Sequence, residues 1–179
     1  VPTLLGNSFA IKTHSGPTPA ALRMLARGRM RATYIYRDPR AALLSAIEYG
    51  RRARQAGSQN AFSRLDSFDK ALDFMLDYVR IWERWMAVEG IHSLRYEDFL
   101  VDYEVEAQRL ADFLGADISS PAVAAAIEAY RPEQASKGDK GLHFQHGQAE
   151  RFRKELSDKE LARANETFAD YLERMGYQR

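Results

Sequence analysis

The sequence contains no cysteine and no long run of apolar residues. Without cysteine the chain can form no disulfide, offers no thiolate to a metal ion and has no cysteine nucleophile. No apolar run approaches the roughly 20 residues that a membrane-spanning helix needs, and no basic-then-apolar leader is found. We therefore expect a cytoplasmic protein without a membrane span.

The chain also has little net charge. Its 26 Lys and Arg residues nearly balance its 25 Asp and Glu residues, so the sequence gives no sign of broad nucleic-acid binding. Any site for an anion must therefore be local. No HExxH or comparable cluster indicates a metal site. The 179 residues lack repeats and suit a single domain, residues 1–179, that buries roughly two thirds of its unfolded surface.

The most informative stretch begins with Ala32–Tyr36, whose β-branched and aromatic residues predict a strand buried on both faces. Pro39 then forbids further strand pairing and suits the first turn of a helix, which we expect over Ala41–Arg52. Such a corner lies at the carboxyl end of a parallel strand, where open α/β sheets bind ligands. Arg37 and Ser45 could face one anion there, as a guanidinium fork and a hydroxyl donor.

The same residues allow another interpretation. Arg37 could form a structural ion pair with Asp38 or a neighbouring carboxylate, and Ser45 could be an ordinary small helix residue. The segment by itself leaves both interpretations open.

A second polar corner precedes this one. The apolar run Phe9–Ile11 predicts another buried strand, and Lys12-Thr13-His14 follows it. Thr18 and Pro19 signal a helix start, so strand, helix and strand would form a right-handed crossover with both polar corners at one sheet edge. A histidine there could accept a proton near neutral pH. Taken alone, His14 would also suit a hydrogen-bonded structural role.

The remainder of the chain is rich in helical patterns. We expect residues 51–60, which are basic and then small and polar without periodicity, to form a mobile surface loop. Apolar residues at helical spacing predict a long helix from Ser67 to a point before Gly90. Further expected elements are a strand at Ile91–Tyr96, helices at Tyr103–Leu114 and Ala122–Tyr130, and a last helix after the Ser157 capping box. Core positions expected in the helix after Tyr103 are Val105, Leu110, Phe113 and Leu114.

Four segments together resemble the sulfotransferases that use 3′-phosphoadenosine-5′-phosphosulfate (PAPS). They are Lys12-Thr13-His14, Arg37 with Ser45, Tyr96-Glu97-Asp98, and a partial match at Gln145-His146-Gly147 followed by Phe152-Arg153. The resemblance implies an α/β fold of three layers, in which helices flank a parallel sheet of the P-loop NTPase kind and the C-terminal half is rich in helices.

The resemblance also implies an activity, the transfer of a sulfuryl group from PAPS to a hydroxyl or amine of a small or medium-sized acceptor. His14 would be the general base that takes the proton of the acceptor, and Lys12 would offset negative charge on the transferring group. The product of the donor would be 3′-phosphoadenosine-5′-phosphate (PAP). The residues that the resemblance assigns to nucleotide binding are Arg37 and Ser45 at the 3′-phosphate, Tyr96 at the adenine, and Gln145, His146 and Gly147 in a wrapping segment.

The sequence departs from the family pattern in two respects. No glycine-containing loop of the Lys-x-Gly-Thr-Thr-Trp type, which binds the 5′-phosphosulfate, lies upstream of Lys12, so we expect an N-terminally incomplete domain. Gln145 and His146 replace an arginine and a lysine. These departures favour an alternative, a non-catalytic nucleotide-binding or interaction module on the same fold. Nothing in residues 50–64 or 131–148 selects a small molecule, glycan or lipid as the acceptor, and oligomeric state is equally open.

Overall fold

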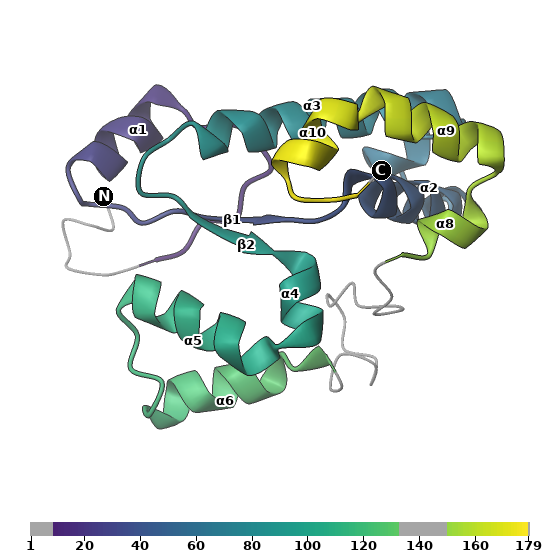
Figure 1. Ribbon diagram of the computed structural model, residues 1–179. Coiled ribbons are helices and arrows are strands. Elements are labelled where there is room, and N and C mark those ends of the chain that lie inside the picture. The colour runs from purple at the N-terminus through teal and green to yellow at the C-terminus, as the bar shows by residue number, and fades with distance from the viewer. Residues whose placement is uncertain (1–8, 133–149, 179) are drawn as a thin grey trace.

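The structure, a computed structural model, describes residues 9–132 and 150–178 as a small parallel sheet flanked by helices (Figure 1). The strands are β1 (Thr33–Tyr36) and β2 (His92–Arg95). The helices are α1 (Pro19–Ala26), α2 (Pro39–Gln55), the short 3₁₀ turn η2 (Phe62–Arg64), α3 (Phe68–Met86), α4 (Tyr96–Val101), α5 (Tyr103–Leu114), α6 (Pro121–Ala129), α8 (Phe152–Glu155), α9 (Asp158–Thr167) and α10 (Ala169–Arg174). Among these helices none is both long and apolar enough to cross a membrane.

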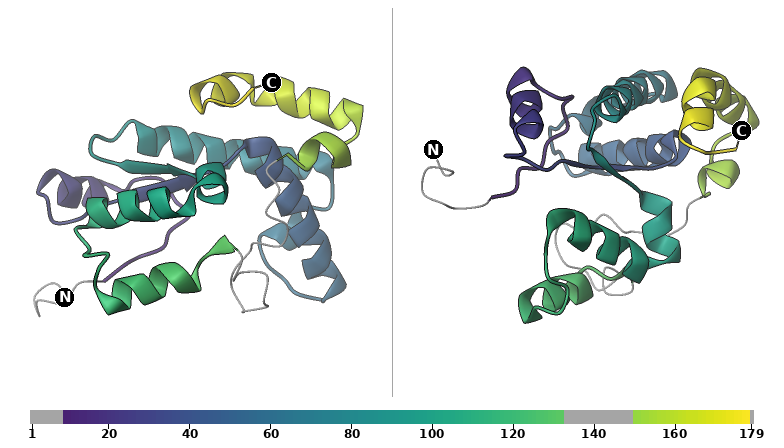
Figure 2. Two further views of the ribbon diagram at one scale, coloured as in Figure 1. Left: turned by 60° about the horizontal axis from the view of Figure 1, so that its bottom comes forward. Right: turned by 60° about the vertical axis from the view of Figure 1, so that its left-hand side comes forward.

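The sheet is parallel, as the sequence predicts. The strands pair in a register that runs from Thr33 opposite His92 to Tyr36 opposite Arg95. Helix α3 lies on one side of the sheet and α5 and α6 on the other, which makes three layers (Figure 2). Because parallel strands end at the same edge, the residues that follow Tyr36 and Arg95 come together there.

The prediction of a strand at Phe9–Ile11 is wrong. These residues form no strand, and Phe9 and Ile11 are 52% and 76% exposed. The segment that follows is attached to α3 instead, where the indole of Trp85 donates a hydrogen bond to the Ser15 carbonyl at 2.9 Å. The crossover therefore starts from β1, passes through α2 and α3 and ends in β2, which occupies the place beside β1.

The described residues cover strand β1 on one face only, which corrects the expectation of burial on both faces. Tyr34 and Tyr36 pack against the cluster formed by α2 and α3, whereas Thr33 and Ile35 point the other way and are exposed, Ile35 by 58%. The helix on that side contacts β2, where the rings of Phe113 and His92 stack with centroids 4.7 Å apart. It therefore leaves the outer face of β1 uncovered.

Local capping signals place the helix ends correctly. Ser67 begins α3 by accepting a hydrogen bond from the Lys70 amide at 3.3 Å. Ser157 and Glu160 form the expected capping box at the start of α9. Gly115 ends α5 in the left-handed conformation, with φ of 69°, which glycine adopts without strain.

Two of the predicted core positions in α5 are wrong. Val105 and Leu114 are 41% and 47% exposed, whereas Ala107 and Ala111 are buried. The helix therefore buries its small side chains most deeply, while Phe113 packs on β2 and Val105 and Leu114 remain at the surface.

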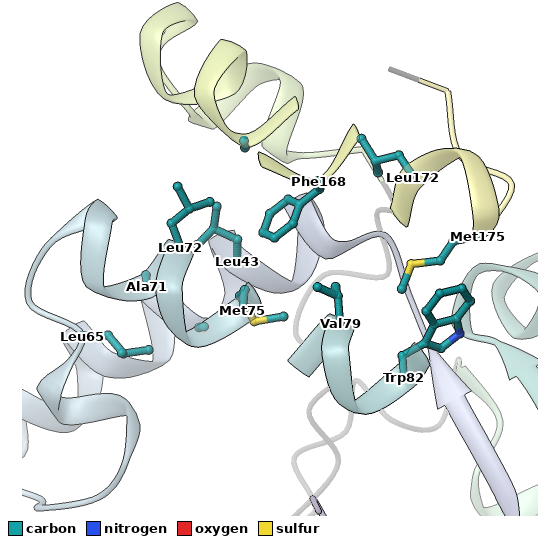
Figure 3. Close-up of a cluster of buried hydrophobic side chains, with 12 residues drawn as sticks. Leu43, Leu65, Ala71, Leu72, Met75, Val79, Trp82, Phe168, Leu172 and Met175 are labelled. Atoms are coloured by element: carbon teal, nitrogen blue, oxygen red, sulfur yellow. The ribbon is translucent and has the colours of Figure 1, made fainter. Parts of the chain in front are cut away.

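The main core joins α2 and α3 to the C-terminal helices (Figure 3). Phe168 is completely buried and separates α9 from α10, so the last helix is interrupted there and not continuous as expected. Its ring lies over α2 and α3 together with Leu172, close to Leu43 and Leu72. This packing holds the C-terminal end of the chain beside the helix that follows β1.

Gly50 lies inside α2, which continues past its predicted end at Arg52. The helix continues to Gln55, so residues 51–55 are helical and not part of a loop. Gly50 is buried where α2 meets η2, and a Cβ atom there would collide with the backbone carbonyl of Phe62. The glycine therefore permits close packing and is not a terminator.

We predict that Gly50→Ala lowers the free energy of unfolding by about 1–3 kcal/mol, because the Phe62 backbone must move to admit the new methyl group. Helix propensity alone predicts the reverse, a gain of up to about 1 kcal/mol. Urea denaturation measures the difference. Gln55→Ala, at the exposed end of the same helix, is the control, and a Gly50→Ala protein as stable as wild type would contradict the packing argument.

Candidate functional site

The chain turns sharply from β1 into α2 at Asp38 and Pro39. Asp38 is the N-cap of α2, and its carboxylate accepts a hydrogen bond from the Arg40 amide at 2.9 Å. Pro39 occupies the first turn, where its missing N–H leaves no donor unsatisfied. The predicted order of strand, corner and helix is confirmed, and the helix begins at Pro39 itself.

Three of the predicted nucleotide-binding residues meet at this corner. Arg37 follows β1 and donates from Nη1 to the hydroxyl of Ser45 at 3.4 Å, across the first turns of α2. Tyr96 follows β2, and its ring lies under the guanidinium of Arg37 with 4.8 Å between Cζ and the ring centroid. The parallel register explains this convergence, because Tyr36 and Arg95, the residues just before Arg37 and Tyr96, are paired.

The guanidinium of Arg37 keeps donor capacity at this corner. Its Nε is buried and has no hydrogen-bond partner in residues 9–132 and 150–178. No carboxylate in the same residues lies within ion-pair distance of it. The structure therefore does not support the alternative interpretation in which Arg37 pairs with Asp38, because Arg40 occupies that carboxylate.

Arg40 forms a buried structural pair that sequence reasoning missed. Its Nε and Nη2 donate to both oxygens of Asp38, at 3.0 and 2.7 Å. The same side chain donates to the Asn165 amide oxygen and to the Gln178 carbonyl, each at 2.7 Å, and lies over the ring of Phe152 at 4.5 Å. Arg40 is 1% exposed. Its side chain therefore stabilises the corner through buried contacts and is not accessible to a ligand.

Glu97 forms a second buried link that the sequence did not reveal. Its Oε1 accepts a hydrogen bond from the Asp38 amide at 3.1 Å, and its Oε2 accepts one from the Tyr177 hydroxyl at 2.6 Å. Arg95 adds an ion pair at 3.7 Å. The only signal in the sequence is the acid that directly follows Tyr96, and its partners lie 59 and 80 positions away.

Burial raises the pKa of the Tyr96 phenol, and the nearby positive charge of Arg37 opposes this rise only in part. The phenol therefore stays neutral at physiological pH and keeps its O–H group. Its aromatic face attracts the guanidinium through the negative potential of the ring. Tyr96 can thus orient Arg37 and also offer an aromatic edge and a hydroxyl at the same corner.

Lys12 and His14 lie on a different segment from this corner. Both side chains are exposed. The imidazole of His14 is near Tyr78 of α3, with ring centroids 6.3 Å apart. Tyr78 also lies near Tyr34 of β1. Burial is the main cause that raises the pKa of the Tyr34 phenol to about 12, and the nearby Tyr78 phenol is the smaller one. The described ring contact of His14 is therefore with α3 and not with a second strand end.

The other predicted site residues, Gln145, His146 and Gly147, lie outside the described residues, as does most of the expected acceptor segment 131–148. In the part of the chain that is described, no three His, Asp or Glu side chains gather as metal ligands. The chemistry visible at the corner is therefore that of a cationic donor group beside a hydroxyl and an aromatic ring.

Comparison with known proteins agrees with this architecture. A family model described as sulfotransferase domain matches residues 7–176. The fold is similar to mouse sulfotransferase SULT7A1 complexed with PAP, with a TM-score of 0.69 and 18% identity over 95% of this chain and 68% of that chain. It is also similar to retinol dehydratase in complex with androsterone and the inactive cofactor PAP, with a TM-score of 0.64 and 21% identity over 95% of this chain and 56% of that chain. A search of curated proteins found no match.

We predict that Arg40→Met lowers the free energy of unfolding by about 3–5 kcal/mol, because it leaves the buried Asp38 carboxylate without its cation. Thermal or urea denaturation measures the loss. Arg80→Met breaks an exposed pair with Asp77 and is expected to change stability by less than about 1 kcal/mol. Equal stability of the two variants would show that the Asp38–Arg40 pair does not hold the corner.

Proposed function

Because the chain belongs to the sulfotransferase family, we propose that it transfers a sulfuryl group from PAPS to a hydroxyl or amine and that the Arg37 corner holds the 3′-phosphate of the nucleotide. The observation that carries the proposal is the half-buried guanidinium of Arg37, which has a buried Nε without a partner in the described residues, a hydroxyl beside it at Ser45 and the ring of Tyr96 against it. A phosphate oxygen is a natural acceptor for such donors.

The charges at the corner suit an anion. Each of the two buried acids there has its own cation: Asp38 is paired with Arg40, and Glu97 with Arg95. Arg37 is therefore a cation at the corner that has no carboxylate partner among the described residues. A phosphate monoester would supply the missing negative charge and would accept hydrogen bonds from the guanidinium and from the Ser45 hydroxyl.

PAPS, when bound, supplies the activated sulfuryl group. In the proposed mechanism Arg37 and Ser45 orient the nucleotide through its 3′-phosphate, and Tyr96 contacts its adenine. The imidazole of His14 takes the proton of the acceptor hydroxyl or amine, and Lys12 offsets negative charge near the transferring group. The exposure of His14 and Lys12 supports these roles, because an acceptor can reach both side chains.

The comparisons support the choice of nucleotide and suggest the size of the acceptor. The two similar structures contain PAP, and one also contains androsterone. We therefore propose PAPS as the donor and a small or medium-sized molecule as the acceptor. The absence of cysteine suits a reducing compartment, so we propose that the reaction takes place in the cytoplasm.

A second candidate function is a nucleotide-binding or interaction module without catalysis. Gln145 and His146, which stand where the family resemblance calls for two cations, favour it. Sulfate transfer by the full-length protein separates the two functions, because only the enzyme turns over a mixture of PAPS and acceptor.

We predict that Arg37→Ala weakens the binding of PAP by about 10- to 100-fold, because it removes charge-assisted hydrogen bonds to the 3′-phosphate. Calorimetric titration of the full-length protein measures the affinity. Adenosine 5′-phosphate, which lacks the 3′-phosphate, should bind the variant and the wild type equally. Arg80→Ala, at an exposed position of α3, is the control. Equal binding of PAP to Arg37→Ala and wild type would remove the proposed role of Arg37.

We predict that His14→Gln reduces the turnover number about 10²- to 10⁴-fold, as expected for the loss of a general base. Its affinity for PAP should stay within about twofold of wild type, because His14 is not part of the Arg37 corner. Steady-state sulfate transfer and calorimetry test the two expectations. Thr13→Ala, at the adjacent exposed position, is the control. Full activity of His14→Gln would show that another group takes the proton.

A further inference from the structure

The carboxylate of Glu97 cross-links the two strand ends that form the corner. Glu97 lies in the first turn of α4, two residues after the end of β2, and its Oε1 accepts the hydrogen bond of the Asp38 amide at 3.1 Å. That amide belongs to the peptide group joining Arg37 to Asp38, one residue beyond the end of β1. The backbone pairing of the two strands ends at Tyr36 and Arg95. The hydrogen bond from the Asp38 amide to the Glu97 side chain therefore connects the two chain segments just beyond the paired strands.

The C-terminal segment holds Glu97 in this position. The hydroxyl of Tyr177 donates to Glu97 Oε2 at 2.6 Å. The ring of Tyr177 lies under Arg95, with Cζ 4.2 Å from the centroid, and meets the ring of Tyr36 edge-on at 6.5 Å. The next residue, Gln178, accepts a hydrogen bond from the buried Arg40 at 2.7 Å. The end of the chain thus contacts both sides of the corner.

We propose that Glu97 and Tyr177 are positioning residues for the 3′-phosphate site and that they act through the Arg37–Asp38 peptide group without touching the nucleotide. This inference rests on the function proposed above. The hydroxyl of Tyr177 fixes the carboxylate of Glu97, the carboxylate fixes the Asp38 amide, and the fixed amide sets the direction in which Arg37 leaves the strand.

Because Glu97 is negatively charged, a positioning role and a direct electrostatic effect of its side chain predict opposite changes in phosphate affinity. A carboxylate beside an anion site repels the anion, so its charge alone would weaken phosphate binding. A positioning role has the opposite effect, because a guanidinium held in one direction loses less conformational freedom when it binds. Replacing Glu97 by Gln removes the charge and keeps an oxygen to accept from Asp38, whereas replacement by Ala removes both.

The experiment measures calorimetric affinities of the full-length protein for PAP and for adenosine 5′-phosphate. The variants are Glu97→Ala, Glu97→Gln, Tyr177→Phe and Arg37→Ala. The matched control is Tyr103→Phe, which removes a hydroxyl that donates to the Ile127 carbonyl at 2.8 Å in the helices on the other side of the sheet. Thermal unfolding confirms that each protein is folded at the titration temperature.

We expect Tyr177→Phe to weaken PAP binding by about 3- to 10-fold and Glu97→Ala by about 10-fold or more, with adenosine 5′-phosphate affinity changed by less than about twofold. Glu97→Gln should bind PAP at least as tightly as wild type, which is the rescue that a positioning role requires. Tyr103→Phe should bind both nucleotides as wild type does.

Three outcomes would overturn the proposal. Equal losses for both nucleotides would indicate a general effect on the fold, and tighter PAP binding by both Glu97 variants would indicate a purely electrostatic effect. Unchanged PAP binding by Tyr177→Phe and Glu97→Ala, together with a loss for Arg37→Ala, would refute positioning and leave the proposed function intact. Unchanged PAP binding by Arg37→Ala would instead refute the assignment of the 3′-phosphate site itself.

Discussion

The peptide group between Arg37 and Asp38 is the constraint on which the rest of the site depends. The Asp38 side chain caps α2 and holds the buried Arg40, and the Asp38 amide is held by Glu97. Because Arg40 donates to both carboxylate oxygens of Asp38, Asp38 is paired with Arg40 and not with Arg37. The guanidinium of Arg37 therefore faces Ser45 and Tyr96 without a carboxylate partner in the described residues, and we propose that it provides a local site for an anion in a nearly neutral protein.

The C-terminal helices place residues that contact the same corner. Phe168 and Leu172 bury themselves against α2 and α3, which brings Tyr177 and Gln178 to Glu97 and Arg40. Packing of the C-terminal helices thereby supports the geometry of the proposed nucleotide site, because the Asp38–Arg40 and Glu97–Tyr177 contacts lie where water is largely excluded. In this arrangement the core and the proposed phosphate site are parts of one structure.

The features that the sequence predicted depend on near neighbours in the chain. Ser67, Pro39 and the Ser157 box mark helix starts through contacts within a few residues. Arg37 and Ser45 are eight positions apart, so a strand end and two helical turns suffice to bring them together. The links of Glu97 to Asp38 and Tyr177 could not be predicted, because they join residues 59 and 80 positions apart without a local pattern. A strand at Phe9–Ile11 would likewise have needed a neighbouring strand, and the Ser15 backbone bonds to α3 instead.

The most direct test of this account is a crystal structure of the full-length protein with PAP bound. The account predicts that the 3′-phosphate lies within hydrogen-bond distance of the Arg37 guanidinium and the Ser45 hydroxyl, with Tyr96 beside the adenosine. A structure in which PAP binds elsewhere, and Arg37 contacts only Ser45 and Tyr96 as it does here, would contradict it.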